Sequence, residues 1–201
     1  VLLLGAGLES LPCRQTADME RMSFYEVDTP AVLAEKEKRL REVGITTPRN
    51  VYRVGVDLAE DWEKTLLEMT PFATEQRTLT ALLGVVYYLP RAAMEALLKR
   101  LAAITSRGSS LLFDCPMRDF GTGEDAAGQQ RALAKSAGET MEQGYTLPEL
   151  ALMLERHGLL IYEDMGPREI TERFYAGYNE GHPESPVLPL PGTALVLAAR
   201  H

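Results

Sequence analysis

Val1-Leu2-Leu3-Leu4-Gly5-Ala6-Gly7-Leu8-Glu9-Ser10 is the stretch of sequence that decides the fold. Four apolar residues run directly into a Gly-x-Gly sequence, which is typical of a buried parallel strand that ends in a ligand-binding loop. Gly5 and Gly7 can adopt backbone angles closed to other residues, and without a Cβ they let a ligand approach the main chain. Ser10 stands where dinucleotide-binding loops carry a third glycine. The stretch therefore predicts a nucleotide-like ligand without deciding which one.

The size and charge of the chain limit its class. Its 201 residues are typical of one domain, and its formal net charge is -8. The sequence has no block of lysine or arginine, so we expect no nucleic-acid partner but rather a small molecule or a protein. Cys13 and Cys115 lie far apart and outside any metal-ligand spacing, and neither a signal peptide nor a spanning segment is visible. We predict a cytoplasmic protein with reduced thiols, no metal and no membrane contact.

Strand-like and helix-like patterns alternate along the chain. We expect strands at residues 1–4, 23–28, 50–58, 78–89, 109–115, 159–162 and 193–199. We expect helices at 31–43, 60–69, 92–104, 147–156 and 168–178, with a short helix within 8–22. This alternation predicts an α/β fold with a Rossmann-like, doubly wound parallel sheet and helices on both faces.

Two of the expected helices carry distinct signals. Thr146 is expected to cap the helix at 147–156, with Glu149 in its first turn and Gly158 at its end. In the helix at 31–43, apolar residues recur on one face. We expect its charges to form a solvated face, made by Glu35, Lys36, Glu37, Lys38 and Arg39.

Two polar stretches interrupt the alternation. Residues 116–145 show no clear strand pattern, and the periodicity of 129–141 favours one helix within either a helical excursion or a mobile lid. Residues 166–191 include a connection rich in proline and glycine. We expect both stretches to be substrate-side insertions in a single domain that spans residues 1–201.

Three features follow consecutive strands. They are the loop from Gly5 to Gly7, Asp28 after the second strand, and Asp57 with Leu58 after the third. Ligands of open α/β sheets bind beyond the carboxyl ends of the strands. The Asp28 carboxylate is suited to accept both hydroxyls of a ribose, and Asp57 to accept from an adenine amine. Each acid alone is more typical of a solvated loop residue or a helix cap, whereas the three features together at consecutive strand ends favour a ligand site.

Two cofactor classes fit these features. A dinucleotide would require a third glycine for close helix packing and would place a pyrophosphate on the helix N-terminus. S-adenosylmethionine carries no phosphate, so two glycines suffice for its close approach to the backbone. Glu9 favours S-adenosylmethionine as well, because a carboxylate beside a pyrophosphate would be repulsive.

The chain resembles the leucine carboxyl methyltransferase family over essentially its whole length. The most specific part is Glu26-Val27-Asp28-Thr29-Pro30 followed by Lys36. The other matching segments are 1–10, Val56-Asp57-Leu58 with Trp62, 84–89, Leu112-Phe113-Asp114, 147–158 and 193–199. This family belongs to the class I S-adenosylmethionine-dependent methyltransferases and includes bacterial O-methyltransferases of small molecules. The resemblance implies a seven-stranded, mostly parallel sheet whose last strand is antiparallel to its neighbours.

The resemblance also implies site residues. Gly5 and Gly7 would line the methionine and ribose part of the cofactor, Asp28 would hold the ribose, and Asp57 and Leu58 the adenine. The predicted cofactor-binding residues are Gly5, Ala6, Gly7, Glu26, Asp28, Asp57 and Leu58. Leu83 departs from the family, many members of which have a glutamate there. Because the chain begins inside a strand, without the family's N-terminal helical segment, we expect that such a segment is absent from this sequence.

The implied reaction is S-adenosylmethionine-dependent O-methylation of a carboxylate or hydroxyl of a small molecule, or of a protein C-terminal carboxylate. A carboxylate acceptor needs no base. A hydroxyl acceptor needs one, and Tyr87, Tyr88 and His157 are the candidates, although core packing for the tyrosines and a helix C-terminus for His157 explain them as well. No catalytic residue is assigned.

Two alternatives remain. One is a nicotinamide-dependent oxidoreductase, from which an antiparallel last strand between its neighbours would distinguish the methyltransferase fold. The other is a non-catalytic cofactor-binding module that retains the fold, which Leu83 favours.

Overall fold

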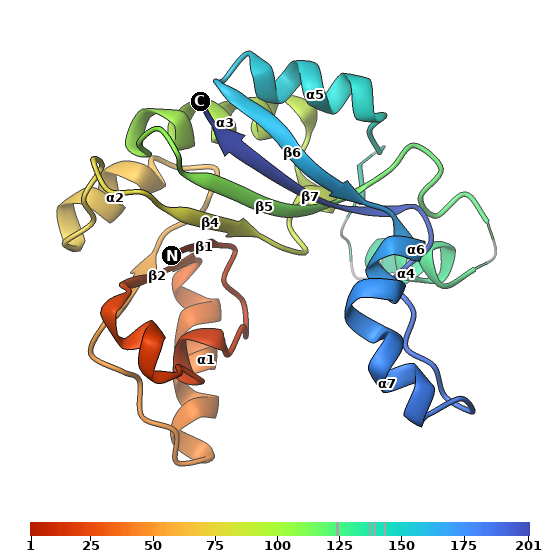
Figure 1. Cartoon of the computed structure of the whole chain (residues 1–201). Coiled ribbons are helices and arrows are strands. Elements are labelled where there is room, and N and C mark those ends of the chain that lie inside the picture. Colours follow the sequence, from red (N-terminus) through yellow and green to blue (C-terminus); the bar gives the residue numbers. More distant parts are fainter. Residues whose placement is uncertain (124, 137, 139, 143) are drawn as a thin grey trace.

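A single twisted sheet with helices on both faces organises the chain (Figure 1). The computed structural model describes residues 1–123, 125–136, 138, 140–142 and 144–201. The strands are β1 (Leu2–Leu4), β2 (Phe24–Asp28), β3 (Val51–Gly55), β4 (Leu79–Leu82), β5 (Ser110–Pro116), β6 (Leu159–Met165) and β7 (Thr193–Arg200). The α-helices are α1 (Pro30–Glu42), α2 (Trp62–Met69), α3 (Arg91–Ile104), α4 (Ala126–Ser136), α5 (Leu147–Glu155), α6 (Pro167–Ile170) and α7 (Ala176–Gly181). Shorter helical segments are η1 (Leu11–Cys13), η2 (Ala17–Arg21), η3 (Val86–Tyr88) and the π-helical η4 (Thr171–Tyr175).

The strand order among the described residues is β3-β2-β1-β4-β5-β7-β6. Neighbouring strands from β3 to β5 are parallel, whereas β7 lies antiparallel between β5 and β6. This order confirms the predicted Rossmann-like sheet and its antiparallel last strand. It also places the ends of β1, β2 and β3 side by side, with Leu4 beside Val27 and Val27 beside Val54.

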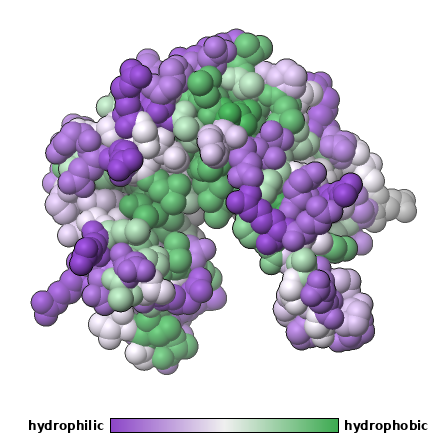
Figure 2. Space-filling view, viewed as in Figure 1, coloured by the Kyte–Doolittle hydropathy of each residue, from purple (hydrophilic) through white to green (hydrophobic). Residues whose placement is uncertain are grey.

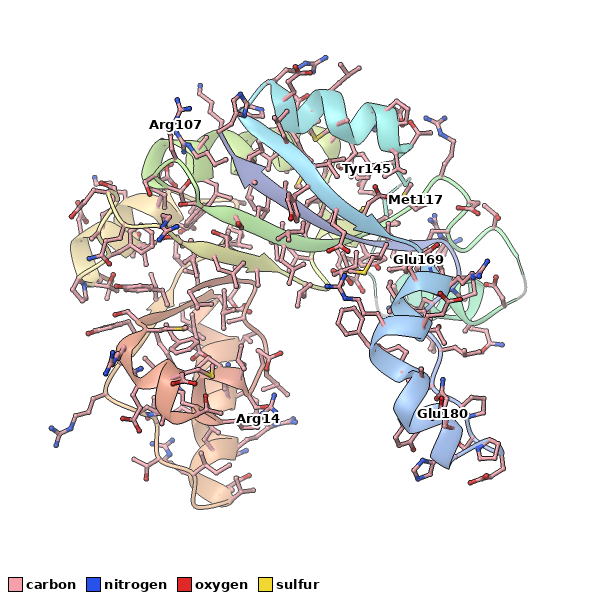
Figure 3. The ribbon with its side chains drawn as sticks, in the orientation of Figure 1. Arg14, Arg107, Met117, Tyr145, Glu169 and Glu180 are labelled. Carbon is pink, nitrogen blue, oxygen red and sulfur yellow. The ribbon has the colours of Figure 1, made fainter. Side chains whose placement is uncertain are left out.

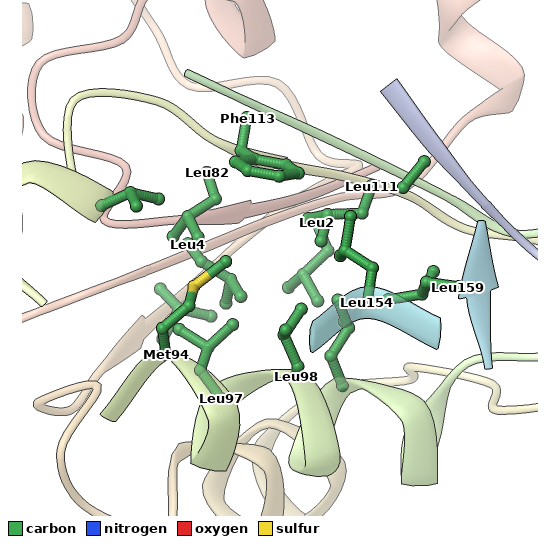
Figure 4. Packing of buried hydrophobic residues seen from close by; sticks show 14 of the residues in the cluster. Leu2, Leu4, Leu82, Met94, Leu97, Leu98, Leu111, Phe113, Leu154 and Leu159 are labelled. Atoms are coloured by element: carbon green, nitrogen blue, oxygen red, sulfur yellow. The ribbon is translucent and has the colours of Figure 1, made fainter. Parts of the chain in front are cut away.

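The main core lies between one face of the sheet and the helices α2, α3 and α5, while α1 packs on the opposite face of the sheet (Figure 1). Met94, Leu97, Leu98 and Leu101 of α3 recur at helical spacing, and all are buried. Figure 4 shows Met94, Leu97 and Leu98 packed near leucines of the strands and of α5. Each such side chain contributes roughly 1.5–3 kcal/mol by its burial. This packing holds the sheet edge on which the predicted site lies.

The fourth strand is shorter than the predicted 78–89. β4 ends at Leu82, and Gly84 then takes a left-handed φ of +72°, which ends the strand and starts a turn. Its amide donates a hydrogen bond to Asp114 Oδ1 of β5 at 2.6 Å, and η3 follows. The apolar run predicts too long a strand, because its second half forms the helical turn η3.

The predicted helix near 129–141 is α4, which ends at Ser136, so Met141 lies outside it. Residues 124, 137, 139 and 143, which belong to the polar stretch, lie outside the described part. A small second hydrophobic cluster fastens this stretch to η3, and it contains Tyr87, Phe120, Ala127, Ala134 and Met141.

The C-terminal elements follow the sequence signals closely. Thr146 and Glu149 form the capping box of α5, and Gly158 adopts φ +74° at its end, as predicted. β6 is longer than predicted and reaches Met165. The expected helix at 168–178 is a nearly continuous helical arm of α6, η4 and α7.

Among the described residues, no helix is both long enough and apolar enough to cross a membrane.

Candidate active site

The loops that follow β1, β2, β3 and β4 surround a cavity of about 480 Å³ at the carboxyl edge of the sheet. Its lining includes five of the predicted site residues, namely Gly5, Gly7, Asp28, Asp57 and Leu58. The remaining lining residues are Thr29, Val56, Leu83, Gly84, Val85, Tyr88 and Leu89. The structure therefore brings the three predicted strand-end features together.

The glycine loop needs both of its glycines. Gly5 has φ +67° and Gly7 has φ +47°, a region that side chains with a Cβ rarely adopt. A Cβ placed on Gly5 would also stand 2.4 Å from Cγ2 of Val85. The amides of Gly5 and Ala6 both donate to the carbonyl of Val27, at 2.9 and 3.2 Å. These contacts turn the chain sharply at the end of β1 and leave its backbone facing the cavity.

Asp28 fixes the other side of this loop. Its Oδ2 accepts a hydrogen bond from the Gly7 amide at 2.8 Å, and its Oδ1 accepts one from the Thr29 amide at 2.7 Å. A carboxylate oxygen has two lone pairs, so each oxygen keeps one for a ligand hydroxyl. Asp28 also lines the cavity.

Asp57 and Leu58 stand at the far wall of the cavity. Oδ1 of Asp57 accepts a hydrogen bond from the Ala59 amide at 2.8 Å, which folds the loop after β3. Val56, Leu58 and Leu89 add apolar surface nearby. This wall suits a flat, apolar ring that carries an amine at its edge.

A second cavity of about 250 Å³ lies on the other side of the glycine loop. Its lining includes Ala6, Leu8 and Glu9, and it shares Gly5, Gly7 and Leu83 with the first cavity. Oε1 of Glu9 accepts from the Leu11 amide at 2.6 Å and lies 3.7 Å from the guanidinium of Arg14. Figure 3 shows Arg14 on the same side of the molecule as α1. A carboxylate at this position disfavours a phosphate and favours an ammonium group.

Glu26 lies elsewhere than predicted. It is fully buried within β2, with Oε1 2.5 Å from Lys36 Nζ and Oε2 2.9 Å from Arg53 Nε. Both of its oxygens are therefore engaged away from the cavities, so we expect Glu26 to hold β2, β3 and α1 together rather than to contact a cofactor. The prediction that Lys36 belongs to a solvated face is wrong for the same reason, because the side chain is only 3% exposed.

Five lining residues between positions 83 and 89 are not among the predicted cofactor-binding residues, although Tyr88 was a candidate base. Leu83 and Gly84 form the turn after β4, and Val85, Tyr88 and Leu89 come from η3 and its flanks. Gly84 was the available signal, since a glycine directly after an apolar run marks a turn beyond a strand end.

The three base candidates differ in position. His157 follows α5 and precedes β6, so it lies at the amino edge of the sheet, opposite the cavity. The Tyr87 hydroxyl is buried 3.1 Å from Oγ1 of Thr193, and burial raises the pKa of Tyr87, which makes it a poor base near neutral pH. Tyr88 lines the cavity and is about one-third exposed.

A larger cavity of about 680 Å³ lies farther along the same edge, where β5 and β6 end and β7 begins. Met117, Leu147, Pro167 and Leu188 give it mainly apolar walls. Figure 3 shows Met117 at this end of the sheet. Both predicted insertions, 116–145 and 166–191, contribute lining residues to this cavity.

Comparison with known proteins also points to methyltransferases. The profile described as leucine carboxyl methyltransferase matches residues 1–102. YktD of Bacillus subtilis, named by inference as an S-adenosyl-L-methionine-dependent methyltransferase, is 30% identical over 178 residues, which are 87% of this chain and 58% of YktD. A protein of Mycolicibacterium paratuberculosis with the same inferred activity is 34% identical over 131 residues, 65% of this chain and 41% of that protein. The chain thus spans about half the length of these relatives.

Solved structures share the fold. Human N-acetylserotonin methyltransferase in complex with S-adenosylmethionine has a TM-score of 0.61 at 15% identity, over 99% of this chain and 46% of its own. The O-methyltransferase NcsB1 from neocarzinostatin biosynthesis, in complex with S-adenosylmethionine and a naphthoic acid, has a TM-score of 0.60 at 14% identity, over 100% of this chain and 48% of its own. With the profile match over half of its length, the chain belongs to the leucine carboxyl methyltransferase family.

Proposed function

We propose that this protein transfers the methyl group of S-adenosylmethionine to an oxygen of a small molecule. The observation that carries the proposal is the Asp28 carboxylate, which holds the glycine loop at Gly7 while it faces a cavity suited to a nucleoside. The inferred activity of YktD and the cofactor bound in the human enzyme support the same cofactor.

The residues present fit this cofactor. Gly5 lines the cavity with backbone alone, since a Cβ there would clash with Val85, and Asp28 has lone pairs left for the two ribose hydroxyls. Asp57 and Leu58 would hold the adenine. Gly5, Ala6 and Gly7 would lie along the methionine part, with Glu9 close to its ammonium group.

The cofactor would supply a methyl group bound to a sulfonium, whose sulfur keeps the electron pair of the C–S bond when that bond breaks. The protein's part is to hold the acceptor oxygen in line, within about 3 to 3.5 Å of the methyl carbon. Because positive charge is lost in this step, a dry and largely apolar site stabilises the transition state relative to the charged ground state. The leucines and valines of the cavity provide such surroundings.

The chain's own sheet argues against the oxidoreductase alternative. β7 lies antiparallel between β5 and β6, an arrangement that the dinucleotide fold lacks. Glu9 beside the glycine loop would repel a pyrophosphate.

The acceptor is proposed to be a carboxylate or hydroxyl of a small molecule, with a protein C-terminal carboxylate as the other oxygen acceptor of the family. The apolar cavity lined by Met117 and Leu188 gives room for an apolar body farther along the edge of the sheet that carries the cofactor cavity. NcsB1, whose fold is similar, was solved with an aromatic acid.

Calorimetry tests the cofactor directly. We expect S-adenosylmethionine and S-adenosylhomocysteine to bind, and NAD to show no measurable heat. If NAD binds and neither S-adenosylmethionine nor S-adenosylhomocysteine does, the result would support the oxidoreductase instead. Binding of S-adenosylhomocysteine with no methyl transfer to any acceptor would identify a non-catalytic module, which the apolar Leu83 at the cavity wall favours as the second candidate.

A further inference from the structure

Asp114, near the carboxyl end of β5, is hydrogen-bonded to a residue that lines the cofactor cavity. β4 and β5 pair as far as Leu82 and Phe113, and just beyond this point Oδ1 of Asp114 accepts the 2.6 Å hydrogen bond from Gly84. Gly84 itself lines the cavity. The carboxylate is therefore one residue away from the proposed cofactor site.

The side chain of Asp114 points to the face of the sheet opposite to α3 and α5. Phe113 and Cys115 on either side of it belong to the main core, and strand residues alternate between faces. Leu112 of the same strand and Leu195 of β7, which lies opposite Asp114, share this face and are half-buried. Figure 2 shows the surface hollowed between α1 and the arm of α6 and α7, with hydrophobic residues in the roof of the hollow.

Its surroundings suit a group that takes up a proton. Burial raises the pKa of Asp114, and hydrogen bonding by the Gly84 amide and the Tyr87 hydroxyl offsets part of that rise. The Tyr87 hydroxyl is in turn bonded to Thr193. A carboxylate with a raised pKa is a stronger base than an exposed one.

Asp114 is also close enough to the proposed reaction. β4 separates β1 from β5, and strands are about 4.8 Å apart, so the end of β5 is roughly 10 Å from the glycine loop after β1. In the proposed binding mode the ribose lies at Asp28 and the methionine part at Gly5 to Gly7, which puts the sulfonium over this loop. An acceptor over the Gly84 turn would then contact both the methyl group and Asp114.

We propose that the acceptor is a neutral hydroxyl on an apolar molecule and that Asp114 accepts its proton. This inference rests on the proposed function. The hydroxyl proton moves to the free lone pairs of Asp114, the acceptor oxygen forms a bond to the methyl carbon, and the C–S bond breaks with its electron pair on sulfur. The products are a methyl ether, protonated Asp114 and S-adenosylhomocysteine. A carboxylate acceptor is disfavoured, because it would stand beside a carboxylate of like charge.

Asp114→Asn separates this role from a structural one. The amide oxygen of asparagine still accepts the Gly84 hydrogen bond, whereas the amide group cannot take up a proton near neutral pH. Asp18→Asn, on the exposed η2, is the matched control. Both variants should unfold in urea like the wild type and should bind S-adenosylhomocysteine within about twofold of it, by calorimetry.

Turnover is measured as release of S-adenosylhomocysteine with a panel of apolar phenols and the benzoates of the same skeletons. We expect phenols to be methylated, with kcat about 10² to 10⁴ times lower in Asp114→Asn and KM little changed. The acidic limb of the wild-type pH profile should be lost in this variant. The nearby titratable groups, Tyr87 of η3 and Cys115 of β5, have pKa values raised by burial, and β4 carries none, so they do not produce that limb.

The outcomes separate the two proposals. If the wild type binds neither S-adenosylmethionine nor S-adenosylhomocysteine, the proposed function itself is overturned. If it binds them, then equal turnover in Asp114→Asn, methylation of benzoates alone, or no turnover of any phenol each overturns the role of Asp114 and leaves cofactor binding intact.

Discussion

Asp28 and Gly7 are joined by a 2.8 Å hydrogen bond between a carboxylate oxygen and a backbone amide, which ties the end of β2 to the loop after β1. The positive φ of Gly7 turns its amide toward that carboxylate. The shape of the glycine loop therefore depends on an acid that lies one strand away.

Replacing Asp28 by alanine removes this bond and the proposed ribose contacts. We expect S-adenosylhomocysteine binding to weaken by about 1.5 to 3 kcal/mol, the usual worth of hydrogen bonds to a charged group. Calorimetry measures the change, with Asp18→Ala on η2 as the control. Unchanged affinity in Asp28→Ala would show that the ribose is held elsewhere.

Replacing Gly5 by alanine combines two costs. The left-handed φ costs about 1 kcal/mol or more for any residue with a Cβ, and the new methyl group would also meet Val85 Cγ2 at 2.4 Å. Gly44→Ala has the same kind of φ, +72°, with no atom within 4 Å, so it isolates the first cost.

Urea unfolding should rank Gly5→Ala as the less stable of these two variants, and only Gly5→Ala should lose cofactor affinity. Adding Val85→Ala should recover part of the stability lost in Gly5→Ala, since it removes the methyl group that clashes. If Val85→Ala recovers no stability, the destabilisation of Gly5→Ala comes from the backbone conformation alone.

The buried ion pair of Glu26 and Lys36 supports the strand that carries Asp28. Lys36→Met leaves the Glu26 carboxylate buried with Arg53 as its remaining cation, and we expect a loss of about 3 kcal/mol in the free energy of unfolding. Lys38→Met, on the exposed side of α1, should cost less than about 0.5 kcal/mol.

A Glu26→Gln/Lys36→Met double variant should be more stable than Lys36→Met, because no carboxylate stays fully buried and the Arg53 guanidinium, which is 17% exposed, keeps contact with solvent. Unfolding in guanidinium chloride measures the stability of the wild type, the two single variants and the double variant. Equal stability of Lys36→Met and Lys38→Met would mean that the pair is of no consequence for folding.

Glu149 makes α5 sensitive to acid. The hydrogen bond from the Thr146 amide, followed by that from Arg118, lowers the pKa of this carboxyl to about 2. Because the folded pKa is depressed, the contribution of Glu149 is present above its unfolded pKa, near 4.3, and is lost as pH falls toward 2. The difference in unfolding temperature between wild type and Glu149→Gln should therefore be largest above pH 5 and should shrink on acidification. A constant difference would contradict the role of the capping box.

The order of strands and helices along the chain could be predicted because its determinants are local, whereas the antiparallel last strand was expected only from the family resemblance. Alternating strand and helix patterns gave the order of elements, and the ends of β1, β2 and β3 carried Gly5, Asp28 and Asp57 to one edge. The capping box of α5 could be found for the same reason, since Thr146 and Glu149 are three residues apart.

Burial could not be predicted where it depends on partners distant in sequence. Lys36 looks like one charge among five on α1, and only the packing of α1 on β2 brings it to Glu26. Asp114 is likewise unremarkable in the sequence, because its position depends on a turn about thirty residues earlier that directs the Gly84 amide toward it. In the run after β4, apolar composition alone does not distinguish a strand from the turn that Gly84 begins.

The position of β7 has a consequence for how the chain folds during synthesis. In the described sheet, β6 pairs with β7 and with no other strand, so β6 has no template until residues Thr193–Arg200 have left the ribosome. The half of the sheet that binds the proposed cofactor, from β1 to β4, can be paired long before that moment. We expect the nascent chain to form its nucleoside pocket first, and to keep the edge of β5 exposed as a site for mispairing until the last strand inserts.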